Sequence, residues 1–216
     1  MIADVMVLFL TGFVSLLGQI TLLRELNVAS YGIELIYIIG LGVWMLLTAA
    51  GALTGGRTLS SRRLAILFLG FAFFLPSCIV FLRAGRFLLG GIPGAYLPFS
   101  RQMAAMVIAL LPAGLISGLL FREAAGMYVE RGKTLAGAYG IESAGSLLGG
   151  LLATICSRYG MQNLPLAVVC GLIAAVVSIF LFRRKGAWAG RAAALLLSVF
   201  LVGVLHQSSS IDRRMT

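Results

Sequence analysis

Charged residues are scarce in this chain of 216 residues, and their scarcity excludes most soluble folds. Only 11% of the residues are Asp, Glu, Lys or Arg, and 60% are hydrophobic. Soluble domains carry roughly 25% charged residues. The charges that are present stand mainly in short segments between long apolar runs. This pattern is typical of a membrane protein that crosses the bilayer several times.

Histidine and cysteine are also scarce, and their positions do not suit metal binding. His206, the one histidine, ends the last apolar run, and Cys78, Cys156 and Cys170 lie inside apolar segments without CxxC spacing. Buried cysteines usually behave as small hydrophobic residues. We therefore expect neither a disulfide nor a metal site. Because no HExxH, Walker A, dinucleotide-binding or Ser/His/Asp pattern is present, we also expect no catalytic residues and no cofactor.

Acidic residues are fewer than basic ones, 7 against 17, which gives a net charge of +10. The arginines gather at the ends of apolar runs, where they meet lipid headgroups and set orientation. No basic face with interleaved aromatic residues is present, so we expect no nucleic-acid partner. Ten of the 17 basic residues fall in loops or at a span end on the side of the N-terminus. This count favours a cytoplasmic N-terminus.

Seven apolar runs reach or approach the length of about 20 residues that a membrane span requires. They lie at 5–23, 33–54, 64–82, 102–121, 135–156, 164–182 and 188–206. The sequence therefore predicts an all-α polytopic membrane domain over 1–206, with a tail or linker at 207–216. The first run continues too far for a cleavable signal peptide, and it begins with Asp4 in place of a basic segment.

Segment 84–100, between the third and fourth runs, is rich in Gly and Pro and too short for an ordinary span. We expect it to be re-entrant or interfacial, because irregular backbone at membrane depth is tolerated only where protein or water satisfies it.

Two short motifs recur along the chain. Leu22–Glu25 resembles Leu120–Glu123, 98 residues later, and Ala50–Gly56 resembles Ala144–Gly150, 94 residues later. If runs one to three repeat as runs four to six, the odd number of spans makes the second copy inverted in the membrane. Such an inverted 3+3 repeat resembles half of a major facilitator transporter, with a site expected at the repeat interface. The alternative is chance likeness between Gly-rich spans.

Glu142 is the most informative single residue, because it stands in an apolar, Gly-rich run. A carboxylate inside a membrane is costly and normally faces a protein-lined cavity with a partner or ligand. Glu142, Gly145, Ser146 and Gly149 are spaced i, i+3, i+4 and i+7, so they share one helix face. One interpretation is ligand or proton chemistry, and the other is a structural pair with an arginine such as Arg122.

Further polar residues precede Glu142 in the chain. Gln19 and Glu25 lie in or just after the first run, and Glu34 opens the second. They either form interhelical hydrogen bonds and interfacial ion pairs, or line the same cavity as Glu142. Several carboxylates in one cavity would suit an amine or another cation. The predicted ligand-binding residues are Gln19, Glu25, Glu34, Tyr139, Glu142, Ser143 and Ser146.

Glycines at GxxxG spacing predict places where helix backbones approach closely. The predicted helix-packing residues are Gly51, Gly55, Gly114, Gly118, Gly145 and Gly149.

Four motifs carry a resemblance that covers nearly the whole chain. They are Gly12-Phe13-x-x-Leu16 leading to Gln19 and Leu23-Arg24-Glu25, Gly51-x-x-x-Gly55-Gly56-Arg57, Gly114-x-x-x-Gly118-x-x-Phe121, and Tyr139-x-x-Glu142-Ser143-x-Gly145-Ser146-x-x-Gly149-Gly150. Together they resemble the N-terminal membrane region of bacterial membrane-fused spermidine synthases, the polyamine aminopropyltransferases.

This resemblance implies a multi-pass protein of the bacterial inner membrane that is linked to polyamine metabolism. Its implied function is to bind or transport a polyamine or a similar small cation. The alternative is a membrane anchor or oligomerisation module of a spermidine synthase. The implied partners are membrane lipids, a polyamine ligand, and either a soluble aminopropyltransferase domain or further copies of the chain.

In that family a soluble domain follows the last span and uses decarboxylated S-adenosylmethionine and putrescine. Segment 208–216 resembles the start of the linker to that domain, so the family's catalytic residues have no counterpart here. We expect no transferase activity from this chain alone. A cytoplasmic synthase domain after seven spans also requires an outside N-terminus, which is opposite to the orientation that the arginines favour.

Overall fold

The computed structural model describes residues 2–54, 59–88, 98–182 and 188–215, which form seven α-helices joined by short connections. The helices are α1 (Ile2–Ala29), α2 (Glu34–Thr54), α3 (Ser61–Leu88), α4 (Phe99–Glu130), α5 (Leu135–Arg158), α6 (Asn163–Leu181) and α7 (Trp188–Met215). All seven are long and apolar enough to cross a membrane. The prediction of an all-α, seven-span membrane protein is confirmed.

The structure adds detail to two sequence expectations about the connections. Residues 84–88 continue α3 and residues 99–100 open α4, so the ends of the predicted re-entrant segment are helical. Residues 89–97 of that segment lie outside the described residues. The predicted tail is also helical, because α7 continues through residue 215. Polar residues such as His206 do not end a helix by themselves, and a helix longer than the bilayer is thick simply continues past its surface.

Glycine makes three of the connections short. Gly32, Gly132 and Gly160 each have a φ between +75° and +78° and separate α1 from α2, α4 from α5, and α5 from α6. Glycine adopts this left-handed conformation without a Cβ penalty. Thr134 then caps α5, where its hydroxyl accepts a hydrogen bond from the Gly137 backbone N–H at 3.2 Å. Such tight reversals place consecutive helices antiparallel to each other.

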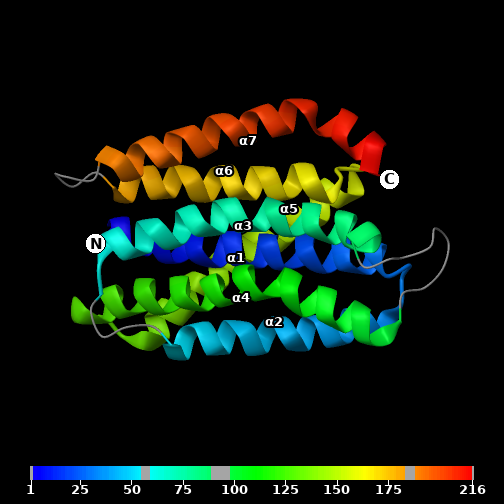
Figure 1. Cartoon of the computed structure of the whole chain (residues 1–216). Coiled ribbons are helices and arrows are strands. Elements are labelled where there is room, and N and C mark those ends of the chain that lie inside the picture. The colour runs from blue at the N-terminus through cyan, green and yellow to red at the C-terminus, as the bar shows by residue number, and fades with distance from the viewer. Residues whose placement is uncertain (1, 55–58, 89–97, 183–187, 216) are drawn as a thin grey trace.

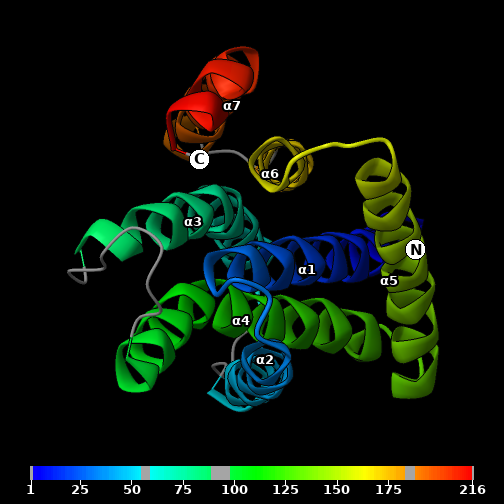
Figure 2. The same cartoon turned by 90° about the vertical axis from the view of Figure 1, so that its right-hand side faces the viewer.

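The helices α1 and α4 lie at the centre of the bundle (Figure 1). α5 packs along α1, α2 packs along α4, and α3 packs along α6. α7 lies at the outer edge, against α6 (Figures 1 and 2). Because helix direction alternates along the chain, α4, α5 and α6 run opposite to α1, α2 and α3 respectively. The two sets of three helices therefore have the inverted arrangement that the sequence motifs suggested.

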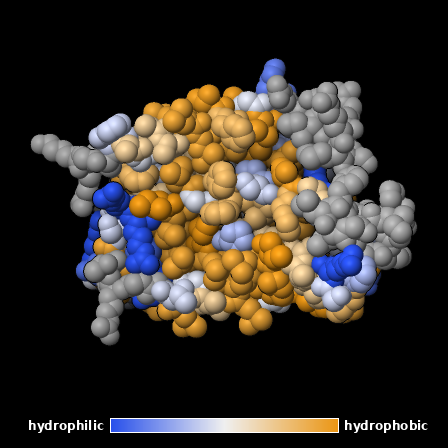
Figure 3. Space-filling view, viewed as in Figure 1, coloured by the Kyte–Doolittle hydropathy of each residue, from blue (hydrophilic) through white to orange (hydrophobic). Residues whose placement is uncertain are grey.

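The surface agrees with a membrane location. A broad hydrophobic band crosses the middle of the molecule, and hydrophilic side chains gather at the two ends of the bundle (Figure 3). α4 has 32 residues, which corresponds to a length of about 48 Å. It is therefore longer than a typical hydrocarbon core of about 30 Å and must tilt or extend past it. The chain is a multi-pass membrane protein.

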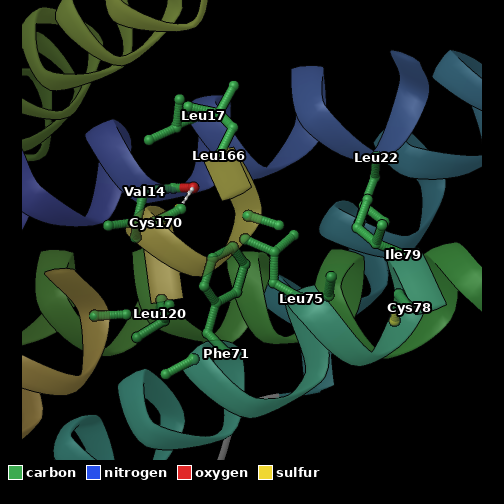
Figure 4. Packing of buried hydrophobic residues seen from close by; sticks show 14 of the residues in the cluster. Val14, Leu17, Leu22, Phe71, Leu75, Cys78, Ile79, Leu120, Leu166 and Cys170 are labelled. Carbon is green, nitrogen blue, oxygen red and sulfur yellow. Dashed lines mark hydrogen bonds between the residues drawn. The ribbon is translucent and has the colours of Figure 1, made fainter. Parts of the chain in front are cut away.

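The core is built from large apolar side chains of α3 that pack against α1, α4 and α6. Phe68, Phe71, Leu75 and Ile79 of α3 are fully buried, and Figure 4 shows the last three beside residues of the other helices. The thiol of Cys170 lies 3.4 Å from the Val14 carbonyl oxygen, to which it donates a hydrogen bond. All three cysteines are free thiols. This core holds α1 and α4 in place from one side and leaves their other side to α2 and α5.

Candidate functional site

Glycines bring α1 and α5 into backbone contact. A Cβ atom added to Gly145 would lie 1.9 Å from the Phe9 carbonyl oxygen, and one added to Gly12 would lie 2.0 Å from the Glu142 carbonyl oxygen. A Cβ atom added to Gly149 would lie 2.4 Å from the Phe13 carbonyl oxygen. No other residue type fits at these positions without separating the helices. The crossing therefore presses the Glu142 segment of α5 against the middle of α1.

A second crossing of the same kind joins α2 to α4. A Cβ atom on Gly118 would lie 1.9 Å from the Thr48 carbonyl oxygen, and one on Gly51 would lie 2.1 Å from the Leu115 carbonyl oxygen. Gly114 packs against the side chain of Leu47. The GxxxG residues of the described chain thus lie where helices cross, within one molecule. Gly55 lies outside the described residues.

The two crossings are equivalent in register. The contact of Gly12 with Glu142 is equivalent to the contact of Gly118 with Thr48. In the same way, the contact of Gly145 with Phe9 is equivalent to the contact of Gly51 with Leu115. The equivalent residues of α2 and α5 are 94 apart, the same offset as the Ala50–Gly56 motif, and those of α1 and α4 are 106 apart. Segments 22–25 and 120–123, which are 98 apart, are therefore not equivalent in this packing. The glycine crossings therefore define the internal repeat, and the likeness of segments 22–25 and 120–123 does not.

A cavity of about 310 Å³ lies between these crossings. Its lining comes from the four helices α1, α2, α4 and α5: Ser15, Leu16, Gln19, Trp44, Thr48, Ala49, Ala52, Ser117, Gly118, Phe121, Tyr139, Glu142 and Ser146. Hydroxyl and amide groups, three aromatic side chains and one carboxylate share this surface. None of these lining residues is basic. Among the described residues, the cavity is therefore lined by one carboxylate and by no basic side chain.

The Glu142 carboxylate has a single side-chain partner among the described residues. The Ser146 hydroxyl lies 2.9 Å from Glu142 Oε1 and also 3.2 Å from the Gly12 carbonyl oxygen. One hydroxyl proton serves these two acceptors, so the carboxylate receives at most a shared hydrogen bond. A carboxylate at membrane depth with so little compensation favours a cationic partner.

Aromatic rings stand close to this carboxylate. Tyr139 precedes Glu142 by one helical turn, and its ring centre is 4.7 Å from that of Phe121 in a tilted arrangement. Trp44 of α2, which is 4% exposed, lines the same cavity. Aromatic faces attract ammonium and guanidinium groups, and the attraction grows where water is excluded. Aromatic rings and one carboxylate together suit an organic ammonium ion better than a hydrated metal ion.

The structure brings four of the seven predicted ligand-binding residues to this cavity: Gln19, Tyr139, Glu142 and Ser146. Ser143 is exposed on another face of α5. This follows from helix geometry, because a residue adjacent to Glu142 points about 100° away from it around the helix. Among the described residues no ion pair or hydrogen bond joins Arg122 to Glu142, and Arg122 Nη1 donates to the Leu53 carbonyl oxygen at 3.4 Å.

Glu25 lies in a different cluster, at the opposite end of α1 from Asp4. Its Oε1 accepts a hydrogen bond from Arg83 Nε at 2.7 Å, and its Oε2 accepts from Asn163 Nδ2 at 2.9 Å. Glu25 and Arg83 are both nearly completely buried. This group ties α1 to α3 and α6, so Glu25 has a structural role here. The expectation that it shares a cavity with Glu142 is not supported.

Glu34 is likewise outside the cavity. It is exposed and stands at the first residue of α2, where an acid interacts favourably with the helix dipole. A single site lined by Glu25, Glu34 and Glu142 is therefore not present. Sequence spacing alone could not separate the three acids, because helix tilt and packing decide which faces meet.

Several lining residues escaped the sequence reasoning: Trp44, Thr48, Ser117 and Phe121. The sequence offset of 94 residues could have indicated one of them, because it makes Thr48 the equivalent of Glu142.

The sequence analysis also did not predict that a second buried acid, Glu123, is paired. It is fully buried, and its Oε1 lies 3.3 Å from Arg63 Nη1 on α3. Arg131, which directly follows α4, forms a further ion pair with Asp4 of α1.

A larger groove of about 710 Å³ lies between α1 and α6. Its lining is entirely apolar, including Met6, Leu10 and Phe180. Specific ligand sites combine apolar walls with a few placed polar groups, so the smaller cavity with Glu142 is the better candidate.

Comparison with known proteins adds no family to this description. No protein-family model matches the chain, and neither a curated protein nor a solved structure matches it.

Proposed function

We propose that this membrane domain binds, and carries across the membrane, a small organic cation of the polyamine class. The observation that carries the proposal is the cavity. Among the described residues, Glu142 is the one ionisable side chain with a carboxylate or basic group in its lining and has only Ser146 as a side-chain partner. The aromatic rings beside it favour an alkylammonium group. Polyamines are the cations that the resemblance to membrane-fused spermidine synthases implies, with the bacterial inner membrane as the location.

The inverted arrangement of α1–α3 and α4–α6 supports a transporter-like role. In transporters with inverted repeats, the substrate site lies near the midplane at the interface of the repeats. Here the cavity is lined by the first two helices of each set. Seven residues of α5 precede Glu142, a length of about 10 Å, which places the acid inside the membrane span rather than at its surface.

The test is ligand binding to the purified chain in detergent. Wild type should bind spermidine and putrescine saturably, and Glu142→Gln should lose this binding because the amide keeps the shape but not the charge. Glu34→Gln is the matched control, since it removes an exposed acid outside the cavity, and it should bind as wild type does. Equal binding by wild type and Glu142→Gln, or no binding by any form, would contradict the proposal.

A second measurement separates transport from binding. Proteoliposomes that contain the wild-type chain should accumulate labelled putrescine, and those that contain Glu142→Gln should not. Saturable binding without accumulation would reduce the function to a binding domain, such as one that supplies a polyamine to an aminopropyltransferase domain.

If the chain is instead a membrane anchor or oligomerisation module, its GxxxG glycines are not free to form the assembly surface. Gly145, Gly149, Gly51 and Gly118 are engaged in crossings within the chain. Substitutions there test the folding of this domain and do not report on assembly with a synthase.

A further inference from the structure

The contacts between Glu142, Ser146 and Gly12 contain one proton too few when the carboxylate is ionised. The Ser146 hydroxyl oxygen lies 2.9 Å from Glu142 Oε1 and 3.2 Å from the Gly12 carbonyl oxygen. A carboxylate and a carbonyl are both acceptors, and a hydroxyl group has one proton to donate. An ionised Glu142 therefore leaves one of the two contacts as an approach of two oxygen atoms without a proton between them.

A proton on Glu142 Oε1 satisfies both contacts. The protonated carboxyl group donates to the Ser146 oxygen, and the Ser146 hydroxyl donates to the Gly12 carbonyl oxygen, because a hydroxyl group can accept and donate at once. The Gly12 carbonyl can accept this bond, since a carbonyl oxygen has two lone pairs. The observed distances therefore fit the neutral carboxyl group better than the carboxylate.

The helices around Glu142 supply no positive charge that would favour the ionised form. Among the described residues that line the cavity, those of α1, α2 and α4 carry no ionisable side chain, and α5 adds only the Tyr139 phenol. Arg122 of α4 does not line the cavity and donates to the Leu53 carbonyl oxygen at 3.4 Å. An uncompensated carboxylate at membrane depth is costly, and such a group becomes neutral by taking up a proton.

We propose that Glu142 holds a proton while the cavity contains no cation, and that it exchanges this proton for the ammonium group of the ligand. The carboxyl O–H bond breaks, its electron pair stays on the Glu142 oxygen, and the proton passes to water. The carboxylate then pairs with the ammonium group. Charge is balanced, because one positive charge enters the cavity and one leaves it.

This exchange names the ion that is coupled to transport. Each turnover carries a ligand in one direction and a proton in the other, so a proton gradient can drive the movement of the ligand. The exchange rests on the proposed function, whereas the proton on the unliganded protein rests on the hydrogen-bond geometry and can be measured by itself.

Infrared spectroscopy tests the proton without a ligand. At neutral pH the purified wild-type chain in detergent should show the carbonyl absorption of a protonated carboxyl group, and Glu142→Gln should lose it. Glu34→Gln is the matched control, because it removes an exposed acid outside the cavity, and it should keep the absorption. The proposal is overturned if wild type and Glu142→Gln show the same absorption from protonated carboxyl groups.

Ser146→Ala tests the hydrogen bonds and keeps the acid. The substitution removes the hydroxyl group that accepts the Glu142 proton. A carboxyl group that donates no hydrogen bond absorbs at a higher frequency than one that does, so the absorption should persist and move to higher frequency. Ser143→Ala, which changes an exposed serine on another face of α5, should leave the frequency unchanged. An unchanged frequency in Ser146→Ala would overturn the assigned hydrogen bonds.

Proton release on binding tests the exchange. When putrescine is added to the wild-type chain in weakly buffered detergent solution at neutral pH, a pH indicator should report one proton released for each putrescine bound. Saturable binding without proton release would overturn the exchange and leave the proposed function intact. Absence of binding would overturn both, and the infrared measurement would still decide whether Glu142 holds a proton.

Discussion

Glu25 and Glu142 are both carboxylates inside membrane-spanning helices, and their surroundings differ completely. Glu25 is 4% exposed and receives hydrogen bonds from Arg83 and Asn163. Glu142 is half-buried, faces a cavity and shares the proton of one serine. Glu25, which is enclosed by donors from two other helices, holds those helices together, whereas Glu142 has few donors and adjoins open space that a ligand can enter. Both the donors within reach and the adjoining cavity separate the two roles.

The largest effect that distinguishes these regions is expected from Arg83→Met. It leaves the buried Glu25 carboxylate without its cation, and losing one partner of a buried pair costs about 3–5 kcal/mol. Thermal unfolding in detergent should show a large loss of stability. Arg158→Met, which removes an exposed arginine at the end of α5, is the control and should change little. A small effect of Arg83→Met would contradict the structural role of this ion pair.

The next effect concerns the crossing that holds the Glu142 face in position. Gly145→Ala places a methyl group 1.9 Å from the Phe9 carbonyl oxygen, and overpacking of this severity costs about 3 kcal/mol. Gly140→Ala is the control five residues earlier on α5, where an added Cβ has no neighbour within 4 Å. Gly140→Ala should be neutral or slightly stabilising, because alanine favours helix. Equal unfolding temperatures for the two variants would refute the close crossing.

Asn163→Ala should have a smaller effect than either. It removes the hydrogen bond to Glu25 Oε2, and hydrogen bonds to charged groups contribute about 1.5–3 kcal/mol. The side-chain oxygen Oδ1 of Asn163 is buried without a hydrogen-bond partner among the described residues, so its removal offsets part of the loss. We expect a destabilisation of about 1.5 kcal/mol by equilibrium unfolding. An increase in stability would show that the unsatisfied oxygen outweighs the bond.

The smallest effect on stability is expected from Glu142→Gln. The amide retains a hydrogen bond with Ser146 and removes a charge that the protein barely compensates, so the change should stay below about 1 kcal/mol. The same variant should have the largest effect on polyamine binding. A small effect on stability together with a large effect on polyamine binding would distinguish Glu142 from Glu25 most clearly. A Glu142→Gln protein that unfolds as readily as Arg83→Met would assign Glu142 a structural role like that of Glu25.

The sequence was most reliable for features that depend on local composition. Apolar length predicted each span, and the i, i+3, i+4 and i+7 spacing correctly placed Glu142, Gly145, Ser146 and Gly149 on one face. The motif at Ala50–Gly56 and Ala144–Gly150 also carried the correct register of α2 with α5. These properties follow from the rise and twist of a helix, which are the same in any tertiary context.

The sequence was least reliable for partners that come from distant helices. Nothing in the spacing of Glu25 indicates Arg83 or Asn163, which lie 58 and 138 residues away. Nor does it show that Trp44, Ser117 and Phe121 complete the cavity around Glu142. Their proximity depends on the angles at which α2 and α4 cross, and these angles are set by side-chain packing summed over whole helices.

By itself, therefore, the sequence determined that the protein is an all-α membrane domain of seven spans with an acid embedded in α5. Bilayer thickness sets the length of a span. Because a charge in hydrocarbon is costly, an acid inside a span indicates a position with a specific role. The tertiary structure decided which embedded acid is satisfied and which is open to a ligand. That distinction depends on the donors within about 3 Å of each carboxylate, and only the packing of the helices brings those donors there.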